Sequence, residues 1–526
     1  MQNNVIQAGM IAGLVAWMCS LVYGQNHPPR ISNFEVIHDS AAHRIELQFD
    51  ITDDEQDDVE VSVGLSDNGG ETFLAPVYSL AGDTGYPVAP GPGKVISFYY
   101  TPDSAGMSNY QIRLVVADRN PVDISSLIAL VDSNRLKQEL SVIEGIRHYQ
   151  ANPSHLEMVK DYIENQFVNQ RLQAYRQPFL HNGYNAHNII GRLPGLKDER
   201  KTYIIDGHFD TVSNSPGADD NGSGIVGMLE AMRILSQYQF KYSLKFIGFD
   251  FEESSPTIGL EGSRRYVSQG IKNYERLEGV FNFEMIGYYS EVPNSQQIPA
   301  GFDVAFPAEY ALVRNDSFRG NFIVNAANDS SANIWAAFSN AASAYVPALR
   351  VISVILPYNG IFTPDFRRSD HASFWDANIK AIMLTDGANF RNHNYHTPQD
   401  TLGTINFTFM SRVVQATIAA VAELAGIQNS TYQIKKITNE MVWSSVLHEP
   451  ACSLRIVRSS STAFTVSADQ CGYTGFTEIL DVQGKRVAAF QLHQGLNTIR
   501  LDKPIAPGLY FIVYKGLVMQ KLALYR

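Results

Sequence analysis

The chain is poor in cysteine and in basic charge. Three cysteines occur among its 526 residues, and two of them, Cys452 and Cys471, lie late in the chain. In an oxidising compartment these two could form a disulfide, and otherwise they remain separate thiols. Lysine and arginine total 41 against 53 aspartates and glutamates, which gives a formal net charge of -12. Because binding to nucleic acid requires a basic face, we predict no nucleic-acid partner.

Long apolar runs are missing beyond the first residues. The stretch 6–23 is apolar and uncharged, small residues surround Gly24, and polar sequence follows from Gln25. This pattern predicts a secretory signal peptide over residues 1–24. The first five residues lack the lysine or arginine that a signal peptide usually has, so a short membrane anchor is the alternative. No later segment has the uncharged apolar length that spans a bilayer, and we predict no transmembrane span.

Length and composition indicate a globular protein of two to four domains. With 45% apolar and 18% charged residues, the composition is not that of a disordered chain. Alternating polar and apolar residues at 44–49, 59–63 and 111–116 predict a small β-sandwich over residues 28–118, which resembles a fibronectin-like domain. Strand-like runs return over residues 444–526 and predict a second β-domain.

An acidic loop, 53–58, joins the first two predicted strands of the N-terminal sandwich. Its carboxylates could hold calcium, which prefers oxygen ligands. Acidic loops of this kind are more often solvated turns, and that is the interpretation we favour.

Helical and strand-like patterns alternate over residues 133–428. Helical periodicity is present at 156–167 and 224–235. The strand-like apolar runs are 202–205, 244–249, 279–283 and 381–384. This alternation predicts an α/β domain with a mostly parallel sheet, flanked by the two β-domains.

Polar residues follow these strands, at the edge where open α/β sheets bind ligands. His208 could bind zinc through one ring nitrogen, and Asp210 could orient the ring through the other. Taken alone, this pair is more often a structural histidine with its hydrogen-bond partner. Asp220 lies in a glycine-rich loop before a helical pattern and could bridge two cations, although a helix cap is the simpler interpretation of that segment.

Further carboxylates and a histidine follow the other strands. Glu252 and Glu253 are adjacent, so their side chains point in different directions, and one can hold a metal while the other faces bound water. Glu284 interrupts an apolar run, where a buried carboxylate needs a cation or hydrogen bonds. His396 follows the last strand and could be a ligand, or an ordinary loop histidine. Two histidines and three carboxylates, without cysteine, suit paired zinc ions and exclude a structural thiolate site.

These motifs resemble those of the M28 metallopeptidases, a family that includes secreted bacterial aminopeptidases. The matching segments, which follow the order of the family, are His208-Phe-Asp210, Asp220-Asn-Gly-Ser-Gly, Glu252-Glu253, Glu284-Met-Ile-Gly and Tyr395-His396-Thr-Pro. The resemblance implies a phosphorylase/hydrolase-like α/β fold, a peptide substrate and two co-catalytic Zn²⁺ ions.

The resemblance also implies a role for each residue. His208 and Glu284 would hold one zinc, Glu253 and His396 would hold the other, and Asp220 would bridge them. Glu252 matches the general base of the family, and Asp210, which belongs to the motif of His208, is predicted to be a catalytic residue as well. Tyr395 stands where some members have a tyrosine that stabilises the oxyanion. The family usually has aspartate at the position of Glu284, which puts full occupancy of both metal sites in question.

Three other functions remain open. Glutaminyl cyclases share the architecture and the paired carboxylates with one working zinc, and Glu284 is compatible with that activity. A carboxypeptidase is possible, because pocket residues set which end of a peptide is cleaved. A non-catalytic surface module built on a degenerate domain is the third, although the intact ligand set argues against it.

The tail resembles the C-terminal sorting domain of type IX secretion cargo. The matching segments are 479–485, 495–499, 507–511 and 521–524. The resemblance implies a β-sandwich that the type IX secretion machinery recognises, and a secreted or cell-surface protein exported through the periplasm. The alternative is an ordinary β accessory domain.

Overall fold

The computed structural model describes most of the chain between the two termini. The described segments are 26–39, 42–101, 110–253, 259–437, 455–459, 463–467, 475–481, 486–493, 496–500, 508–514 and 517–524. The predicted signal peptide and both candidate disulfide cysteines, Cys452 and Cys471, lie outside the described residues.

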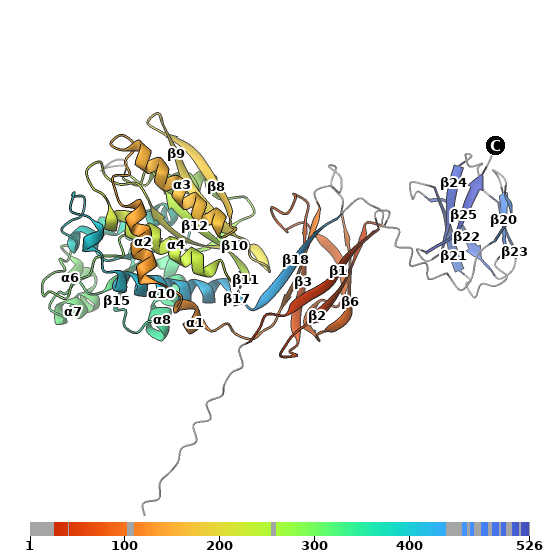
Figure 1. The fold of residues 1–526 in the computed structure, drawn as a ribbon, viewed down its shortest axis with the longest axis horizontal. Coiled ribbons are helices and arrows are strands. Elements are labelled where there is room, and N and C mark those ends of the chain that lie inside the picture. The colour runs from red at the N-terminus through yellow and green to blue at the C-terminus, as the bar shows by residue number, and fades with distance from the viewer. Residues whose placement is uncertain are drawn as a thin grey trace, which may run out of the picture.

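An eight-stranded mixed sheet forms the centre of the α/β domain, which spans residues 124–428 (Figure 1). Its strands, in spatial order, are β15 (Val351–Leu356), β14 (Ile323–Asn328), β16 (Ala381–Thr385), β13 (Arg276–Phe283), β10 (Asp198–His208), β12 (Tyr242–Phe249), β9 (Tyr184–Leu193) and β8 (Gln173–His181). The central four, β16, β13, β10 and β12, are mutually parallel, and each contains one predicted strand. β14 and β9 run antiparallel to these four, so the sheet is mixed rather than mostly parallel.

Side chains of the central strands point alternately into two cores, as a pleated strand requires. Ile205 packs into the larger core and Ile204 into the smaller one. The helices of the larger core are α2 (Ser133–Ile143), α3 (Pro153–Asn169), α4 (Gly224–Leu235), α8 (Ala332–Tyr345) and α10 (Phe407–Ala425). Short helices cover the other face, among them α6 (Phe302–Ala305) and α9 (His371–Asp376). Both predicted helices are present, within α3 and as α4.

Helix α10 is long and apolar enough by length and composition to cross a membrane, the one such helix among the described residues. Its best window is 67% buried inside the protein. Val413, Ile418 and Val421 on this helix lie in the larger core. The helix therefore has the environment of a core element in this structure.

Two four-stranded sheets face each other at the N-terminal side and share one apolar core. The first sheet contains β1 (Arg30–Asp39), β2 (Arg44–Thr52), β6 (Gly91–Tyr100) and β4 (Val77–Gly82). The second contains β18 (Ser430–Lys436), β7 (Gln111–Ala117), β3 (Val59–Ser66) and β5 (Gly85–Val88).

Strand β18 comes from the far side of the α/β domain in the sequence. It pairs with β7 from Ser430 opposite Ala117 to Lys436 opposite Gln111, and Ile437 lies in the sandwich core. Figure 1 shows it as a blue strand beside the red and orange ones. We predicted no strand here, because residues 430–436 lie between two predicted domain ranges. The chain therefore leaves the sandwich after β7 and returns to it.

A buried ion-pair group joins the sandwich to the α/β domain. Glu199, on β10, lies 3.0 Å from Arg192 of the same domain and 3.9 Å from Arg113 of strand β7. The backbone N–H of Phe73, in the sandwich, donates to the same carboxylate at 2.5 Å. Removing one partner of such a group would leave a buried charge unpaired, which typically costs about 3–5 kcal/mol.

The C-terminal region contains two further antiparallel sheets. One has β19 (Arg455–Ser459), β20 (Ala463–Ser467) and β23 (Leu496–Arg500). The other has β22 (Arg486–Leu492), β21 (Gly475–Asp481), β24 (Gly508–Tyr514) and β25 (Leu517–Leu524).

Candidate metal centre

Every predicted metal ligand lies at the carboxyl edge of the four parallel strands. His208 is the last residue of β10, Glu252 and Glu253 follow β12, and Glu284 follows β13 directly. Asp220 is in a single turn, Ala218–Ser223, that leads into α4. His396 follows β16 in a loop. Because neighbouring parallel strands end at one edge of the sheet, residues far apart in the sequence meet there.

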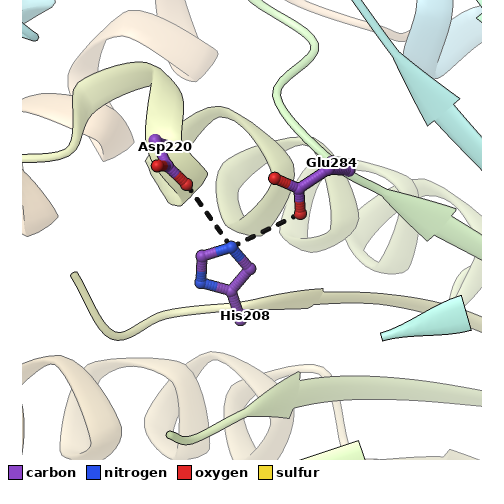
Figure 2. Close-up of side chains that lie close together, drawn as sticks. All are labelled: His208, Asp220 and Glu284. Carbon is purple, nitrogen blue, oxygen red and sulfur yellow. Dashed lines mark ion pairs between the residues drawn. The ribbon is translucent and has the colours of Figure 1, made fainter. Parts of the chain in front are cut away.

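The first cluster consists of His208, Asp220 and Glu284, all buried. The ring nitrogen Nε2 of His208 lies 3.5 Å from Asp220 Oδ1 and 3.4 Å from Glu284 Oε2. Figure 2 shows the three side chains pointing toward one another from separate elements. These are the three residues predicted to hold one metal ion.

The second cluster shares Asp220 and adds Glu253 and His396. His396 Nε2 lies 3.0 Å from Asp220 Oδ2 and 2.8 Å from Glu253 Oε1. Asp220 thus presents one carboxylate oxygen to each cluster. The family resemblance predicts that Asp220 bridges two metal ions, and the position of this carboxylate is compatible with that role.

Glu284 reaches the first cluster despite its extra methylene group. Its Oε2 atom accepts a hydrogen bond from the Ser369 hydroxyl at 2.7 Å, beside His208. The longer side chain is therefore held by a specific donor, and its position is compatible with metal binding.

Divalent cations fit these clusters on the chemistry of their donors. The Nε2 atom of His208 is buried without a hydrogen-bond partner, although two carboxylates lie close to it. Among the described residues, no lysine or arginine lies within ion-pair distance of Asp220, Glu253 or Glu284. Buried carboxylates without a cation are costly, and imidazole with carboxylate is a common zinc donor set.

Glu252 has the environment expected of a proton acceptor. Burial raises the pKa of this carboxyl well above its ordinary value, and the charges of Glu253 and Glu284 raise it further, while His208 opposes the shift. Burial likewise raises the pKa of Glu253 to about 8. A bound metal ion adds positive charge, which lowers the pKa of a nearby carboxyl. The pKa values of Glu252 and Glu253 therefore depend strongly on whether metal is bound.

The carboxylate of Asp210 lies beside His208 and also holds a loop. We expected this carboxylate to orient His208; it lies 3.6 Å from the ring nitrogen Nδ1, and the backbone oxygen of Asp210 lies 3.2 Å from the same atom. The carboxylate also accepts the backbone N–H groups of Glu252 at 3.0 Å and Glu253 at 2.9 Å. It therefore fixes the loop that presents both glutamates, a role that side-chain spacing in the sequence does not reveal.

Asp400 performs the same task for the bridging residue. Its two carboxylate oxygens accept the backbone N–H groups of Asp219 at 2.9 Å and Asp220 at 3.1 Å. Asp400 belongs to the motif segment after Tyr395, but sequence reasoning assigned it no role. A carboxylate that accepts two successive N–H groups orients the backbone that positions the ligand.

Arg147 is a further residue that the sequence did not indicate. It is fully buried and donates to the backbone oxygens of Phe209 and Gly217, at 2.5 and 2.8 Å. It thereby ties together the loops that hold His208 and Asp220. Its other acceptors are the backbone oxygens of Ile143, Gly145 and Pro216.

A pocket of about 790 Å³, including its open mouth, lies beside the clusters. Glu284, Tyr395 and Arg368 are among the residues that line it. Its remaining surface is predominantly apolar and includes Ile298, Phe302, Val313, Phe322, Val324, Ile352, Phe366, Met383 and Phe390. Its size and lining suit a large apolar side chain.

Comparison with known proteins assigns the chain to a family. The model of peptidase family M28 matches residues 188–421. The chain is 31% identical over 277 residues to the uncharacterized protein YfbL of Escherichia coli strain K12, a match that covers 51% of this chain and 80% of YfbL. The chain belongs to peptidase family M28. This membership confirms the predicted enzyme class, a metal-dependent peptide hydrolase of the metallo-aminopeptidase type.

Two further proteins are similar to this M28 peptidase, one by sequence and one by structure. Aminopeptidase YwaD of Bacillus subtilis strain 168 is 28% identical over 263 residues, a match that covers 48% of this chain and about half, 47%, of YwaD. The crystal structure of the LapA aminopeptidase of Legionella pneumophila aligns with a TM-score of 0.43 at 20% identity, covering 58% of this chain and 73% of LapA.

Proposed function

We propose that this M28 peptidase is a secreted, zinc-dependent aminopeptidase that removes N-terminal residues from peptides. The observation that supports it most directly is the pair of clusters that share Asp220 beside an apolar pocket. Two zinc ions would be held there, one by His208, Asp220 and Glu284 and the other by Asp220, Glu253 and His396. Bound zinc supplies a Lewis acid and lowers the pKa of bound water.

Glu252 is the proposed general base and then the general acid. Its carboxylate lies 3.9 Å from His208 Nε2, next to the first cluster but outside both ligand groups. It accepts a proton from the attacking water and delivers it to the amine that leaves when the peptide bond breaks. The same carboxylate can perform both transfers, because it holds the proton taken from water until the leaving amine accepts it.

Tyr395 is the proposed donor to the oxygen that becomes negative in the tetrahedral intermediate. Its ring stacks on that of His396, with 3.8 Å between the centroids and 16° between the planes. Burial raises the pKa of the phenol, so the hydroxyl stays protonated and can donate. A preorganised donor of this kind stabilises the transition state more than the substrate.

The pocket would take the side chain of the first residue of the peptide. Burial of that side chain next to Glu284 places the following peptide bond at the clusters, and the free α-amine of the substrate would face the carboxylates. The predominantly apolar walls of the pocket favour leucine, phenylalanine or methionine over charged residues.

The test is turnover of a panel of aminoacyl-p-nitroanilides beside copies with a blocked amine. We expect cleavage of the unblocked compounds only, with loss of activity after removal of zinc by a chelator and recovery after zinc is returned. No cleavage of any anilide although zinc is bound, together with removal of the last residue from a peptide that has a blocked amine and a free carboxylate, would favour a carboxypeptidase. Conversion of N-terminal glutamine to pyroglutamate, with no p-nitroaniline released, would favour a glutaminyl cyclase. Absence of bound zinc together with absence of turnover would favour a non-catalytic surface module.

We further propose that the protein is exported through the periplasm and recognised by the type IX secretion machinery through residues 444–526. The uncharged stretch 6–23 and the motif segments of the tail support this proposal. Fractionation of the producing cells tests it. The protein should reach the cell surface or the medium without residues 1–24, and deletion of residues 444–526 should leave it in the periplasm. Retention of the intact chain in the cytoplasm would contradict export.

A further inference from the structure

Phe251 joins the end of strand β12 to the two adjacent glutamates of the metal centre. β12 ends at Phe249, and Phe251 directly precedes Glu252 and Glu253. The φ angle of Phe251 is +57°, in the left-handed region that residues with a side chain rarely adopt. Such a conformation is unfavourable, so it persists only where the surrounding structure imposes it, and it is found most often at functional sites.

The ring of Phe251 is held in a small aromatic cluster. The residue is 1% exposed, and it packs with Phe179 of β8 and Ala186 of β9. The centre of its ring lies 4.8 Å from that of Tyr149, 5.1 Å from that of His181 and 6.3 Å from that of Phe179. These partners belong to the segment before α3 and to the β8–β9 hairpin. Elements outside the metal centre therefore fix the position of the ring.

The backbone that follows Phe251 is hydrogen-bonded in the direction that this turn gives it. The backbone oxygen of Phe251 accepts the N–H of Glu261 at 3.1 Å, and the oxygen of Glu252 accepts the N–H of Leu260 at 3.0 Å. The N–H groups of both glutamates donate to the Asp210 carboxylate. Rotation of Phe251 to an ordinary negative φ angle would turn the following peptides away from these partners. The left-handed turn therefore sets the direction in which both glutamates point.

The same backbone conformation recurs at the metal centre. Met285, directly after Glu284, has a φ angle of +55°, and the proposed ligand His396 has one of +60°. Phe251 differs from His396 because it is not a ligand, and the rings that hold it lie outside both clusters. It is therefore a position where side-chain packing can be separated from metal binding by substitution.

We propose that Phe251 is a positioning residue for the reaction. Its ring, held by the aromatic cluster, keeps the backbone left-handed and so orients Glu252 as the base and Glu253 as a ligand before substrate arrives. Groups that are held in a productive geometry in advance react faster, because no part of the barrier is needed to align them. The part that concerns Glu252 rests on the proposed function, whereas the part that concerns Glu253 can be measured without turnover.

Two substitutions separate the ring from the backbone angle. Phe251→Ala removes the ring and keeps a Cβ atom that disfavours the left-handed conformation, whereas Phe251→Gly removes the same ring and adopts that conformation freely. We expect kcat of Phe251→Ala to fall by about 10²-fold with little change in KM, the effect of a small misplacement of a reacting group. Its zinc affinity, measured by competition with a chelator, should fall about tenfold. Phe251→Gly should recover at least about tenfold in kcat and most of the zinc affinity, although it also lacks the ring.

Phe338→Ala is the matched control. Phe338 lies on α8, fully buried in the larger core, and its replacement leaves a comparable cavity far from the metal centre. The Tm of this variant should fall as that of Phe251→Ala does, but its kcat and zinc affinity, assayed well below the Tm, should equal those of the wild type. Should Phe251→Ala not fold, Phe251→Val replaces it, because its branched side chain leaves a smaller cavity and disfavours the left-handed conformation still more.

Equal kcat and equal zinc affinity in the alanine and glycine variants of Phe251 would show that the residue only fills the core, and would overturn the proposal. Values equal to those of the wild type in both variants would overturn it as well. A wild type that binds zinc but releases no p-nitroaniline would instead contradict the proposed function. In that case the zinc affinities alone decide whether Phe251 positions Glu253.

Discussion

Arg368 donates a hydrogen bond from Nη2 to the hydroxyl oxygen of Tyr395 at 2.9 Å. Its guanidinium carbon also lies 5.7 Å from the centre of the Tyr395 ring. Because the hydroxyl oxygen accepts this charged donor, its own proton is available to an acceptor in the site. Arg368 is therefore a positioning residue for the proposed oxyanion donor, and its charge makes that donor stronger.

We predict that Tyr395→Phe lowers kcat by about 10²-fold with little change in KM, as loss of an oxyanion donor does. Arg368→Gln should lower kcat by about tenfold, and Arg368→Lys should recover part of that loss. In the double variant, the two effects should not multiply, because Arg368 acts through Tyr395. Effects that multiply fully would show that Arg368 acts by another route.

The adjacent glutamates should separate catalysis from metal binding. Glu252→Gln keeps the shape of the side chain but cannot accept a proton, so we expect kcat to fall by at least about 10²-fold with zinc content unchanged. Glu253→Gln, its matched neighbour, should instead lower zinc affinity. Metal analysis of dialysed proteins beside p-nitroanilide kinetics measures both. Wild-type turnover in Glu252→Gln would refute the role assigned to this residue.

Asp400 should affect zinc affinity without touching the metal. In Asp400→Asn one of the two N–H groups, of Asp219 or of Asp220, loses its acceptor oxygen, so the bridging carboxylate is less well oriented. We expect affinity to fall about 10- to 100-fold, the usual effect of outer partners of metal ligands. Competition with a zinc chelator measures it, and Asp329→Asn, at an exposed position, is the control. Equal zinc affinities in Asp400→Asn and Asp329→Asn would show that Asp400 does not support metal binding.

The pocket should decide which N-terminal residue is removed. Ile352 lines the pocket and is 3% exposed, so Ile352→Phe should reduce the volume that the pocket offers to a substrate. We expect kcat/KM for phenylalanine and leucine substrates to fall at least about tenfold relative to kcat/KM for an alanine substrate. Ile361→Phe makes the same change at a 60% exposed position outside the pocket and should leave the ratio unchanged. An unaltered preference in Ile352→Phe would show that the pocket does not receive the substrate.

His371 should make the protein less stable in mild acid. Burial lowers its pKa to about 3 from the ordinary 6.5, so the folded state keeps it neutral while the unfolded chain protonates. Between these values the unfolded state binds more protons, and the free energy of unfolding falls by about 2 kcal/mol from pH 7 to pH 5. Urea unfolding followed by fluorescence suits this test, because the Trp375 ring lies 4.5 Å from His371. In His371→Gln this contribution to the pH dependence of the free energy of unfolding should be absent. The same pH dependence in the variant and in the wild type would contradict the role of His371.

The sequence was informative where local pattern and chemistry coincide. The four parallel strands have apolar runs, and the ligands directly follow them or stand at helix starts, so both were predictable. Asp400 and Arg147 were not, because they act on backbone groups far away in the sequence, and nothing in their own neighbourhood reveals the acceptor or donor. The support that Asp210 gives to the loop of Glu252 and Glu253 was not predictable for the same reason, since its partners there are main-chain N–H groups. The sequence also could not show that Asp53 is buried while the other residues of the acidic loop, 54–58, are exposed, because burial differs between neighbours of similar composition.

Because β18 pairs with β7, the N-terminal sandwich cannot be completed until the ribosome has synthesised the α/β domain. When the ribosome has completed β7, the neighbour of that strand is still more than 300 residues away, since β7 ends at Ala117 and β18 begins at Ser430. Until then β7 presents an open edge, the kind of surface on which unfinished chains associate. A chain that stops at residue 428 retains every residue that we propose as a metal ligand and still keeps that edge uncovered. The shortest version of this enzyme that folds cleanly should therefore extend through Ile437, whose side chain completes the sandwich core.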